Sequence, residues 1–206
     1  MHGLAEAFVR HGGRIHERTR VIDYCYRTAT VSTDDGFKVS AQHVCLATNV
    51  PINRDLTLHT GRVTARKRYA VALPLQAPVL HALYHTSEPA PYTARVVGNA
   101  LLVTGEYHAS GQFVHHYKDY PAAVEGWARA RFPQIGDGCR LAAWSVQVME
   151  PVDKLGLYGE SALSAGKNKV WIATGDSGQP MTGAALAAMI IGTVGGVWSG
   201  AGAVWV

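Results

Sequence analysis

One stretch near the end of the chain limits the possible folds more than any other. The uncharged apolar run Val170–Thr174 leads into a glycine turn, Gly175–Gly178, and a helical pattern follows from about Met181 to Val194. A continuous apolar run of this length is typical of a strand buried on both faces. A second run of this kind, Val44–Ala47, occurs much earlier. Such strands need covering layers, so the sequence predicts an α/β fold in which the two runs belong to the same layer. They call for helices on both sides and further parallel neighbours, and the sequence does not supply enough of either.

The glycine turn is suited to binding a ligand. Gly175 and Gly178 would let a ligand approach the backbone closely, and the helix beyond them offers unpaired N–H groups and the positive end of its dipole. Asp176 has a carboxylate that accepts hydrogen bonds from the hydroxyls of a sugar or a ribityl chain. An ordinary left-handed turn capped by Asp or Ser has the same spacing, so the spacing alone leaves both interpretations open.

The remainder of the chain is predicted to form mainly short strands. Two further helices are expected, one over residues 3–11 that ends at Gly12-Gly13, and one over Tyr120–Phe132 that ends at Pro133. No helical pattern separates the strands between 62 and 104, so this region should be an antiparallel sheet. The expected strands are Arg14–His16, Arg20–Tyr26, Thr28–Thr33, Phe37–Ser40, Lys67–Leu73, Val79–His85, Ala94–Val97, Leu101–Gly105, Leu141–Val148 and Leu155–Gly159.

The composition argues against several classes of partner. The chain has 206 residues and a net charge of +4, and its densest basic patch, Arg62–Arg68, holds only four basic residues. Such a patch is more typical of a solvated surface than of a nucleic-acid interface, so no nucleic-acid partner is expected. The three cysteines, Cys25, Cys45 and Cys139, are too far apart for a disulfide framework or a CxxC metal site. A reducing, cytoplasmic location is the simplest expectation.

Neither end of the chain predicts a membrane segment. The first residues do not resemble a signal peptide, because no long apolar run or cleavage site occurs there. Residues 184–206 are apolar and uncharged, long enough to suggest a transmembrane helix. They contain several glycines and no flanking Lys or Arg, which favours a buried helix followed by a Gly-rich tail over 195–206.

Two further candidate sites are better explained without a metal-binding or catalytic role. His115-His116 has no third ligand at metal spacing, so a solvated turn is expected and no metal site is predicted. Ser177 lies in G-D-S-G and not in the G-x-S-x-G pattern of a nucleophile elbow, so it is not predicted to be a nucleophile.

Several stretches together resemble one family of enzymes. Val170–Thr182 resembles the C-terminal flavin-binding motif of the FAD-dependent amine and amino-acid oxidoreductases, the D-amino-acid oxidase-like superfamily. Trp144–Asp153 resembles the family's W-S-G-Q-x-M-E-P-x-D stretch, and Thr104–His108 with Gly111-Gln112 resembles its G-G-E-D-H…G-Q stretch. Val44–Asn49 (VCLATN) resembles the family's strand ending in A-T-N, and His11–Val21 resembles the segment near the adenine. The similarity covers about residues 2–192 and is nearest the bacterial members related to glutamylputrescine oxidase, some of them fused to a Rieske domain.

The resemblance implies a cofactor, a reaction and a set of contacts. Such enzymes bind FAD and oxidise an amine or amino acid by hydride transfer from a C–H bond to the flavin, which needs no nucleophile, so no catalytic residue is assigned. Arg95, in P-Y-T-A-R, resembles part of the family's substrate lobe and could pair with a substrate carboxylate, although a surface or structural role is equally open. The residues implied for cofactor binding are Val21, Ala47, Thr48, Gly175, Asp176, Gly178, Met181 and Thr182.

The sequence also departs from the family pattern. The family opens with a strand, a GxGxxG turn and a helix that hold the FAD pyrophosphate, and this sequence lacks them. Family glycines are replaced by Val146 and Pro180, and the family's Thr-His pair appears as Thr182-Gly183. We therefore expect the C-terminal portion of such an enzyme, with its N-terminal half missing.

The expected architecture is a mixed α/β fold of two interleaved lobes. Residues 1–50 and 141–194 should form a partial FAD-binding lobe, and residues 51–140 a mostly antiparallel substrate-side lobe. One function open to such a chain is FAD-dependent oxidation of an amine or amino acid. The alternative is a non-enzymatic truncated derivative or interaction module that binds little or no FAD. The missing fingerprint favours the alternative for this chain in isolation.

Overall fold

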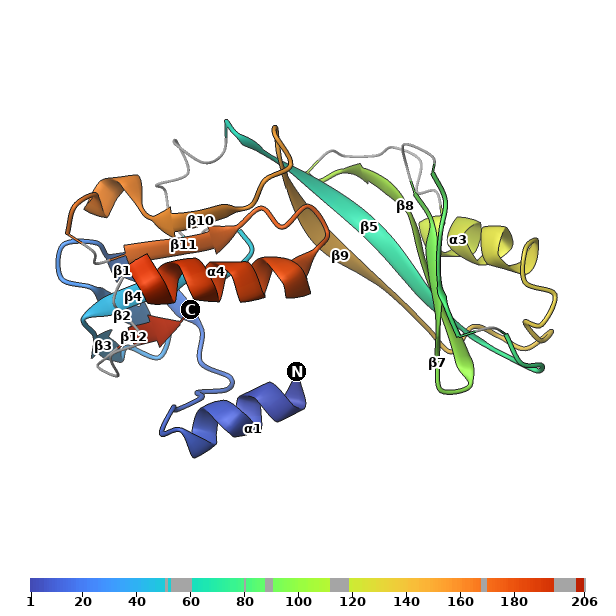
Figure 1. The fold of residues 1–206 in the computed structure, drawn as a ribbon, viewed down its shortest axis with the longest axis horizontal. Coiled ribbons are helices and arrows are strands. Elements are labelled where there is room, and N and C mark those ends of the chain that lie inside the picture. Colours follow the sequence, from blue (N-terminus) through green and yellow to red (C-terminus); the bar gives the residue numbers. More distant parts are fainter. Residues whose placement is uncertain are drawn as a thin grey trace. The chain divides into compact units, whose positions relative to one another are not determined.

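The structure is a computed structural model of the chain. It describes residues 1–50, 52, 61–79, 81–87, 91–111, 119–167, 170–194 and 203–205. These residues fall into two compact units. Unit 1 takes its residues from Met1–His59, Leu157–Thr174 and Met181–Val206, and unit 2 from Thr60–Gly156 and Gly175–Pro180. Figure 1 shows the helices and strands, which form the predicted mixed α/β fold with antiparallel sheets.

In its described residues, unit 1 is built around a four-stranded sheet in the order β10-β11-β4-β12. The central strands, β4 (His43–Leu46) and β11 (Val170–Thr174), are parallel. β12 (Ala203–Trp205) runs parallel to β4 on its other side, and β10 (Leu157–Glu160) is antiparallel to β11. The two apolar runs therefore belong to one layer, as predicted, and are neighbours in it. The strand β12 was not predicted, because it lies in the expected Gly-rich tail.

Layers cover both faces of the β4–β11 pair. On one face, Ala187 and Ile191 of α4 (Pro180–Val194) pack against Cys45 and Trp171. The other face is covered by a meander of three antiparallel strands, β1 (Val21–Cys25), β2 (Thr30–Thr33) and β3 (Lys38–Ser40). The buried residues on that face are Tyr24, Ala29, Val31, Val44, Leu46, Val170 and Ile172. A meander thus covers the face for which the sequence supplies no helix.

The helix α4 forms where it was predicted but is buried on one side only. Ala187 and Ile191 are almost completely buried, whereas Leu186 is 48% exposed and Met189 is 64% exposed. The prediction that residues 184–191 form a buried helix is therefore correct for one face of the helix only. None of the helices among the described residues is long and apolar enough to span a membrane.

The N-terminal helix α1 (His2–Arg10) is also present as predicted, but none of its residues is buried. Its apolar side chains Leu4, Phe8 and Val9 are between 45% and 65% exposed. Gly12, with a φ of 87°, follows the helix in a backbone conformation that favours glycine. The strand predicted at Arg14–His16 is wrong, because the backbone there is irregular.

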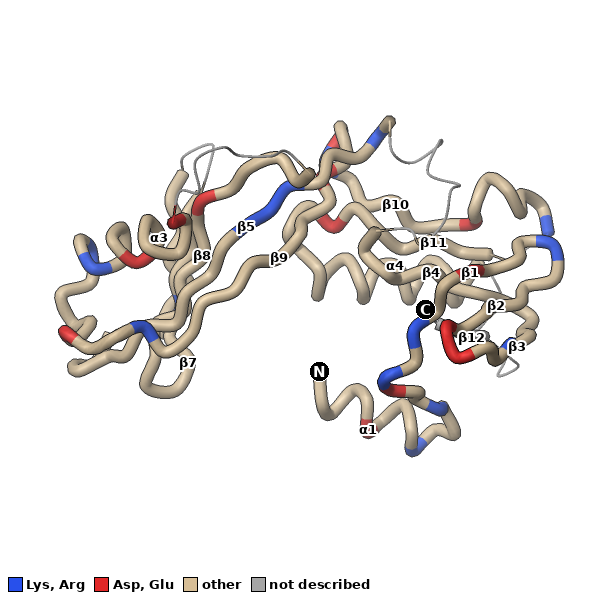
Figure 2. Tube along the Cα trace, turned by 180° about the vertical axis from the view of Figure 1, so that it is seen from behind, with Lys and Arg blue, Asp and Glu red and all other residues tan. Residues whose placement is uncertain are grey.

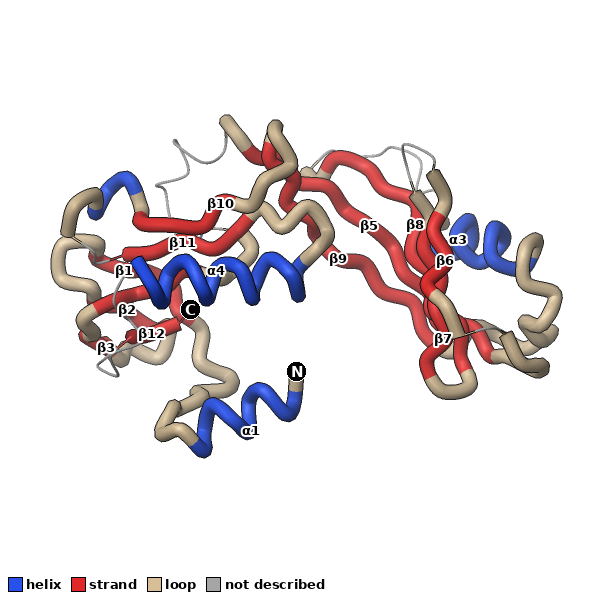
Figure 3. Tube along the Cα trace, in the orientation of Figure 1, coloured by secondary structure: helices blue, strands red, loops and turns tan. Residues whose placement is uncertain are grey.

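Unit 2 contains, in its described residues, a five-stranded antiparallel sheet in the order β6-β7-β8-β5-β9, red in Figure 3. The antiparallel arrangement predicted for residues 62–104 is confirmed. The strands are β5 (Val63–Pro74), β6 (Leu83–His85), β7 (Thr93–Val97), β8 (Ala100–Ala109) and β9 (Ala142–Pro151). β9 pairs with β5 along its whole length, so 142–151 lies in this sheet, although the sequence analysis grouped 141–194 with the other lobe. Long-range strand pairing decided this, and local patterns do not reveal it.

Helix α3 (Tyr120–Arg129) covers one face of the unit 2 sheet. Its start is capped by Asp119, whose carboxylate accepts a hydrogen bond from the Ala122 N–H at 3.2 Å. The core beneath it consists of Val71, Leu73, Leu75, Ala94, Leu101, Val103, Val124, Ala128, Phe132 and Ile135. Trp144 and Val146 of β9 are not part of this core and are 43% and 47% exposed. Because strand residues alternate between faces, Trp144 shares the opposite face with its β5 partner Ala70.

Candidate functional site

The carboxyl ends of β4 and β11 lie at the same end of the unit 1 sheet because the two strands are parallel. In open α/β sheets, ligands bind at the carboxyl ends of the strands. Just after β4, Ala47 is exposed and Thr48 is half-buried, and the Thr48 hydroxyl donates a hydrogen bond to the Val50 carbonyl at 2.6 Å. At the end of β11, the Thr174 hydroxyl donates to the carbonyl of Asn49. The A-T-N stretch and the end of β11 are therefore tied together.

The glycine turn after β11 has a left-handed backbone. Gly175, Ser177 and Gly178 have φ angles of 75°, 51° and 84°. Glycine adopts such angles without cost, so two of the three positions are suited to it. Asp176 closes the turn, because its Oδ1 accepts a hydrogen bond from the Gly178 N–H at 2.8 Å. This is the Asp-capped turn that the spacing left open, and it uses one of the two carboxylate oxygens.

Two hydrogen bonds hold this turn on the segment at the end of β9. The Ser177 N–H donates to the Met149 carbonyl at 3.1 Å, and the Ser177 hydroxyl donates to the Lys154 carbonyl at 3.4 Å. All three residues belong to unit 2, whereas Thr174 and Met181, which flank the turn in sequence, belong to unit 1. The Ser177 hydroxyl therefore has a structural partner.

The helix α4 begins directly after the turn. Pro180 is its first residue, a position where the missing proline N–H costs nothing. Met181 and Thr182 in the first turn are exposed, and N–H groups at this position have no partner within a helix. Val21, the first residue of β1, is half-buried and packs against the meander core. We therefore expect Val21 to offer a ligand its backbone and not its side chain.

The predicted cofactor contacts fit one part of an FAD molecule. The N–H groups at the start of α4 and the Thr182 hydroxyl suit the carbonyl oxygens of a flavin ring, and the second oxygen of Asp176 suits ribityl hydroxyls. Residues 175–194 contain the carboxylate of Asp176 and no Lys or Arg to offset it, so this stretch repels an anionic pyrophosphate. The stretch is therefore better suited to the ring and ribityl side of FAD than to its pyrophosphate.

The candidate substrate residue Arg95 lies on β7 and is exposed. A more strongly positioned cation, Arg68, lies on β5. Arg68 is half-buried, its Nη2 donates to the Pro91 carbonyl, and its buried Nε has no hydrogen-bond partner among the described residues. Burial lowers the pKa of Arg68, and the nearby Tyr107 and Glu150 oppose that shift. An unpaired buried N–H of a guanidinium is a natural donor to an anion.

Arg66 lies on the same strand face as Arg68 but is already paired. Its Nε is 2.8 Å from Glu150 Oε2, and its guanidinium lies over the Tyr107 ring at 5.0 Å. The sequence analysis treated 62–68 as a solvated patch, which Figure 2 shows as blue segments along β5. The overlooked signal is the spacing of two between these arginines, which places both on one face of a strand.

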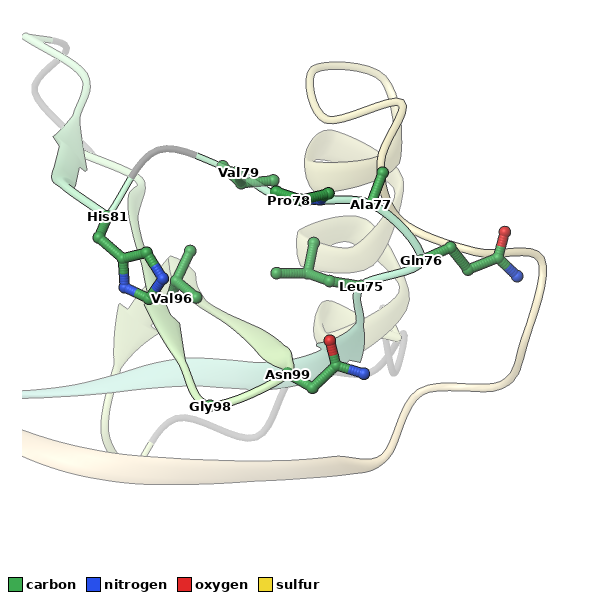
Figure 4. A pocket seen from close by; sticks show the side chains of 9 residues that line it. All are labelled: Leu75, Gln76, Ala77, Pro78, Val79, His81, Val96, Gly98 and Asn99. Atoms are coloured by element: carbon green, nitrogen blue, oxygen red, sulfur yellow. The ribbon is translucent and has the colours of Figure 1, made fainter.

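A separate hollow in unit 2 has a volume of about 300 Å³ (Figure 4). Leu75, Val79 and Val96 form its apolar part, and His81 and Asn99 lie at its margin. None of the predicted site residues lines it. The predicted turn at His115-His116, and Gln112 of the G-Q stretch, lie outside the described residues.

Three solved structures illustrate the shared fold. Glycine oxidase from Geobacillus kaustophilus matches with a TM-score of 0.68 and 22% identity, over 91% of this chain and 52% of that one. L-proline dehydrogenase from P. horikoshii matches with a TM-score of 0.69 and 16% identity, over 94% and 54% of the two chains. L-amino acid deaminase from Proteus vulgaris matches with a TM-score of 0.62 and 17% identity, over 91% and 49%. The chain thus spans about half the length of the solved chains it matches.

The family is shown by a match over nearly the whole sequence. No curated protein matches the chain. The family model described as FAD dependent oxidoreductase matches residues 1–193. With the strand ends of β4 and β11 and the glycine turn in place, the chain belongs to the family of FAD-dependent oxidoreductases.

Proposed function

We propose that this chain supplies the flavin-ring side and the substrate side of an FAD-dependent oxidoreductase that oxidises an amine or an amino acid. The observation that carries the proposal is the continuous path from β11 through the Asp176-closed turn into α4, beside the Thr48 end of parallel β4. The overall resemblance of the sequence favours a member related to glutamylputrescine oxidase. When bound, the flavin supplies the two-electron acceptor for oxidation of the C–N bond.

Each predicted residue has a distinct part in holding the cofactor. The first-turn N–H groups of α4, at Met181 and Thr182, donate to the ring. Asp176 keeps the turn closed with one oxygen and offers the other to the ribityl chain. The backbone beyond β4 and at the start of β1 completes the contacts, through Ala47, Thr48 and Val21. Gly175 and Gly178 keep the turn in the left-handed conformation that this arrangement needs.

The proposal includes weak FAD binding by the chain alone. A glycine loop that holds a pyrophosphate donates several charge-assisted hydrogen bonds, each worth about 1.5–3 kcal/mol. Losing only two of them, taken as additive, weakens affinity by roughly a hundredfold or more. We therefore expect turnover only when a second polypeptide segment supplies that loop.

The substrate side of the proposal rests on Arg68. Its buried, unpaired Nε and its position beside exposed Trp144 and Val146 on one sheet face suit the carboxylate of an amino acid next to an apolar side chain. Arg66 cannot serve in the same way, because Glu150 neutralises it. This favours Arg68 over the exposed Arg95 as the carboxylate partner.

FAD titration followed by flavin fluorescence tests the cofactor site. The titration uses the chain alone and the chain mixed with the part of the Geobacillus kaustophilus glycine oxidase that the match leaves uncovered. We expect little binding alone and a yellow complex after mixing. In the mixture, Asp176→Ala should weaken FAD binding about tenfold or more, because the turn loses its closing bond to a charged group. Asp176→Asn, which keeps an accepting oxygen, should lose less.

Asp119→Ala is the matched control, because it removes a similar carboxylate-to-N–H bond at the start of α3. It should leave FAD affinity unchanged. Equal losses for Asp119→Ala and Asp176→Ala would contradict the assigned site. Tight, stoichiometric FAD on the chain alone would contradict the expected division of the cofactor between two segments and the alternative of a non-binding remnant.

Paired substrates test the role of Arg68 in the assembled, FAD-containing protein. Each amino acid is compared with the amine that lacks only its carboxylate. Arg68→Met should lower kcat/KM for the amino acids by about tenfold to a hundredfold, since one charge-assisted bond is lost, and should leave the amines unchanged. Arg95→Met should change neither. Equal losses for both substrate classes would assign Arg68 a structural role, and a selective loss in Arg95→Met would move the carboxylate site to Arg95.

A further inference from the structure

The orientation of Arg68 depends on the carbonyl group of Pro91. The Nη2 of Arg68 donates to this carbonyl, while its buried Nε has no hydrogen-bond partner within the described part of the chain. A guanidinium is planar, and its N–H groups have a fixed geometry. Because the side-chain stem holds one end of the group and the Pro91 carbonyl holds Nη2, the direction of the Nε–H bond is set as well. Whatever fixes Pro91 therefore also fixes the donor that is proposed to bind a substrate carboxylate.

Tyr92, the residue after Pro91, is held through both its backbone and its ring. Its N–H donates to the Thr86 hydroxyl, and its carbonyl accepts from the Thr86 N–H, both at 3.0 Å. The ring stacks on Trp127 of α3, with the ring centroids 4.4 Å apart and the planes 7° apart. A Cβ at Gly105 would overlap the Tyr92 ring, so glycine lets the ring lie against β8. These contacts give Tyr92, and the Pro91 carbonyl before it, a defined position.

The Tyr92 hydroxyl has an acceptor on β8, since it donates to Glu106 Oε1 at 2.6 Å. Glu106 is the extra residue of a β-bulge, opposite the junction of Arg68 and Tyr69 on β5. Its φ of 44° costs free energy in any residue other than glycine. Bulges re-aim side chains, and strained residues cluster at functional sites. At this point the bulge brings the Glu106 carboxylate to the residue that follows Pro91.

Tyr92 and the Arg68 side chain belong to opposite faces of the unit 2 sheet. The Tyr92 ring packs against α3, which covers one face. Arg68 alternates with the core residue Val71 and its neighbours along β5, so it shares the other face with Trp144. A ligand at Arg68 Nε would therefore not meet the Tyr92 hydroxyl. Any influence of Tyr92 on that ligand must pass through the Pro91 carbonyl.

We propose that Tyr92, held by Glu106, positions Arg68 for carboxylate binding by fixing the Pro91 carbonyl that orients the guanidinium. Tyr92 is a positioning residue and not a catalytic one. The inference rests on the proposed function in one respect, because it takes the ligand of Arg68 to be a substrate carboxylate. If Tyr92 had only a structural role, it would stabilise the packing of α3 on the sheet and leave the Arg68 guanidinium unaffected.

The Arg68 Nε–H signal in a two-dimensional ¹H–¹⁵N NMR spectrum of the full chain reports this positioning. Arg68→Met identifies the signal by its disappearance. Tyr92→Phe removes the hydroxyl and keeps the ring, so we expect it to shift the signal and to speed its exchange with water about tenfold or more, because a hydrogen bond to a charged group is lost. Glu106→Ala removes the same bond from its other partner and should act alike, and the double variant should add little to either.

Two further variants separate positioning from a general weakening of the sheet. Thr93→Val is the matched control, because it removes the 2.6 Å bond between the hydroxyls of Thr93 and Thr104, which joins β7 to β8 one residue further along. Glu106→Gln keeps an oxygen that accepts from the Tyr92 hydroxyl. Both variants should leave the Arg68 signal unchanged. An unmoved signal in Tyr92→Phe, or equal effects of Tyr92→Phe and Thr93→Val, would overturn the positioning role.

Phenylacetate and its neutral counterpart phenylacetamide test the ligand of Arg68. In the parent chain, phenylacetate should shift the Arg68 Nε–H signal and phenylacetamide should not. Tyr92→Phe should raise the Kd for phenylacetate about tenfold, and Thr93→Val should leave it unchanged. Equal shifts with both compounds, or none with either, would refute the carboxylate role in the proposed function, while an altered signal in Tyr92→Phe would still support the positioning of Arg68. Equal phenylacetate affinity in all these variants would keep the proposed function and refute the positioning role.

Discussion

Units 1 and 2 differ in how completely they cover their own apolar surface. In unit 2, α3 closes a core in which Leu101 and Val103 have no exposed surface. In unit 1, both faces of the sheet are covered, yet α4 and α1 leave Met189 and Leu4 about two-thirds exposed. The contrast teaches that unit 2 builds its core from its own elements. Among the described residues, unit 1 leaves apolar side chains of both its α-helices exposed.

Substitutions in the two cores should have the largest effect on the stability of each unit. Leu101→Ala in unit 2 should lower the free energy of unfolding by about 2–5 kcal/mol, because a fully buried leucine leaves a cavity. Hydrogen exchange should then rise in β8 and β5, while β4 and β11 stay protected. Ile191→Ala, at a residue only 1% exposed, is the reciprocal variant and should raise exchange in β4 and β11. Loss of protection in both units with either variant would show that they unfold together.

A buried thiol should make unit 1 the more alkali-sensitive unit. Burial raises the pKa of Cys45 to about 12. Above pH 9 the unfolded thiol loses its proton while the native thiol keeps it, so the native state binds more protons and stability falls as pH rises. The expected slope is about 1.4 kcal/mol per pH unit between pH 9 and 12.

Urea unfolding at a series of pH values, with hydrogen exchange in β4 and β8, measures this slope. In unit 1, Cys45→Ala should make the slope of stability against pH shallower by the contribution of about one proton. Cys25→Ala is the control, because Cys25 is exposed and the hydrogen bond from the Thr28 side chain lowers its pKa. An unchanged slope in Cys45→Ala would place the alkaline sensitivity elsewhere.

The smallest expected effect concerns the outer face of α4. Met189→Lys should change the free energy of unfolding of the chain by no more than about 0.5 kcal/mol, since the side chain is 64% exposed. Ala187→Lys, on the buried face of the same helix, should destabilise unit 1 severely because it buries a charge. Thermal and urea unfolding of both variants measure the difference in stability between the two faces of α4. A large loss in Met189→Lys would mean that unit 1 already covers this face.

Local patterns in the sequence predicted the elements better than their partners. Val44–Ala47 and Val170–Thr174 were predicted as buried strands of one layer because an uncharged apolar run has few alternatives. The pairing of β9 with β5 was missed, since nothing within Ala142–Pro151 specifies a partner seventy or more residues away. β12 was missed because its glycine-rich surroundings have no strand pattern.

The candidate site could be predicted only where its residues are contiguous in the sequence. The turn at Gly175–Gly178 was recognisable because glycine spacing reports the backbone conformation, and the structure has the expected positive φ angles there. The internal bond of Asp176 could not be predicted from the spacing, which suits a capped turn and a ligand-binding turn alike. Arg68 was missed because its importance depends on burial and on an unpaired Nε, which only the folded sheet reveals.

The pairing of β4 with β11 also has a consequence for synthesis of the chain. Val44 pairs with Val170, and Thr60–Gly156, which supplies most of unit 2, lies between them in sequence. On a ribosome, that intervening segment emerges and can fold while β4 still has no parallel neighbour. At about 5–20 residues per second, β4 waits on the order of ten seconds for β11. An unpaired apolar strand in a nascent chain is prone to aggregation, so chaperone demand during synthesis should centre on β4.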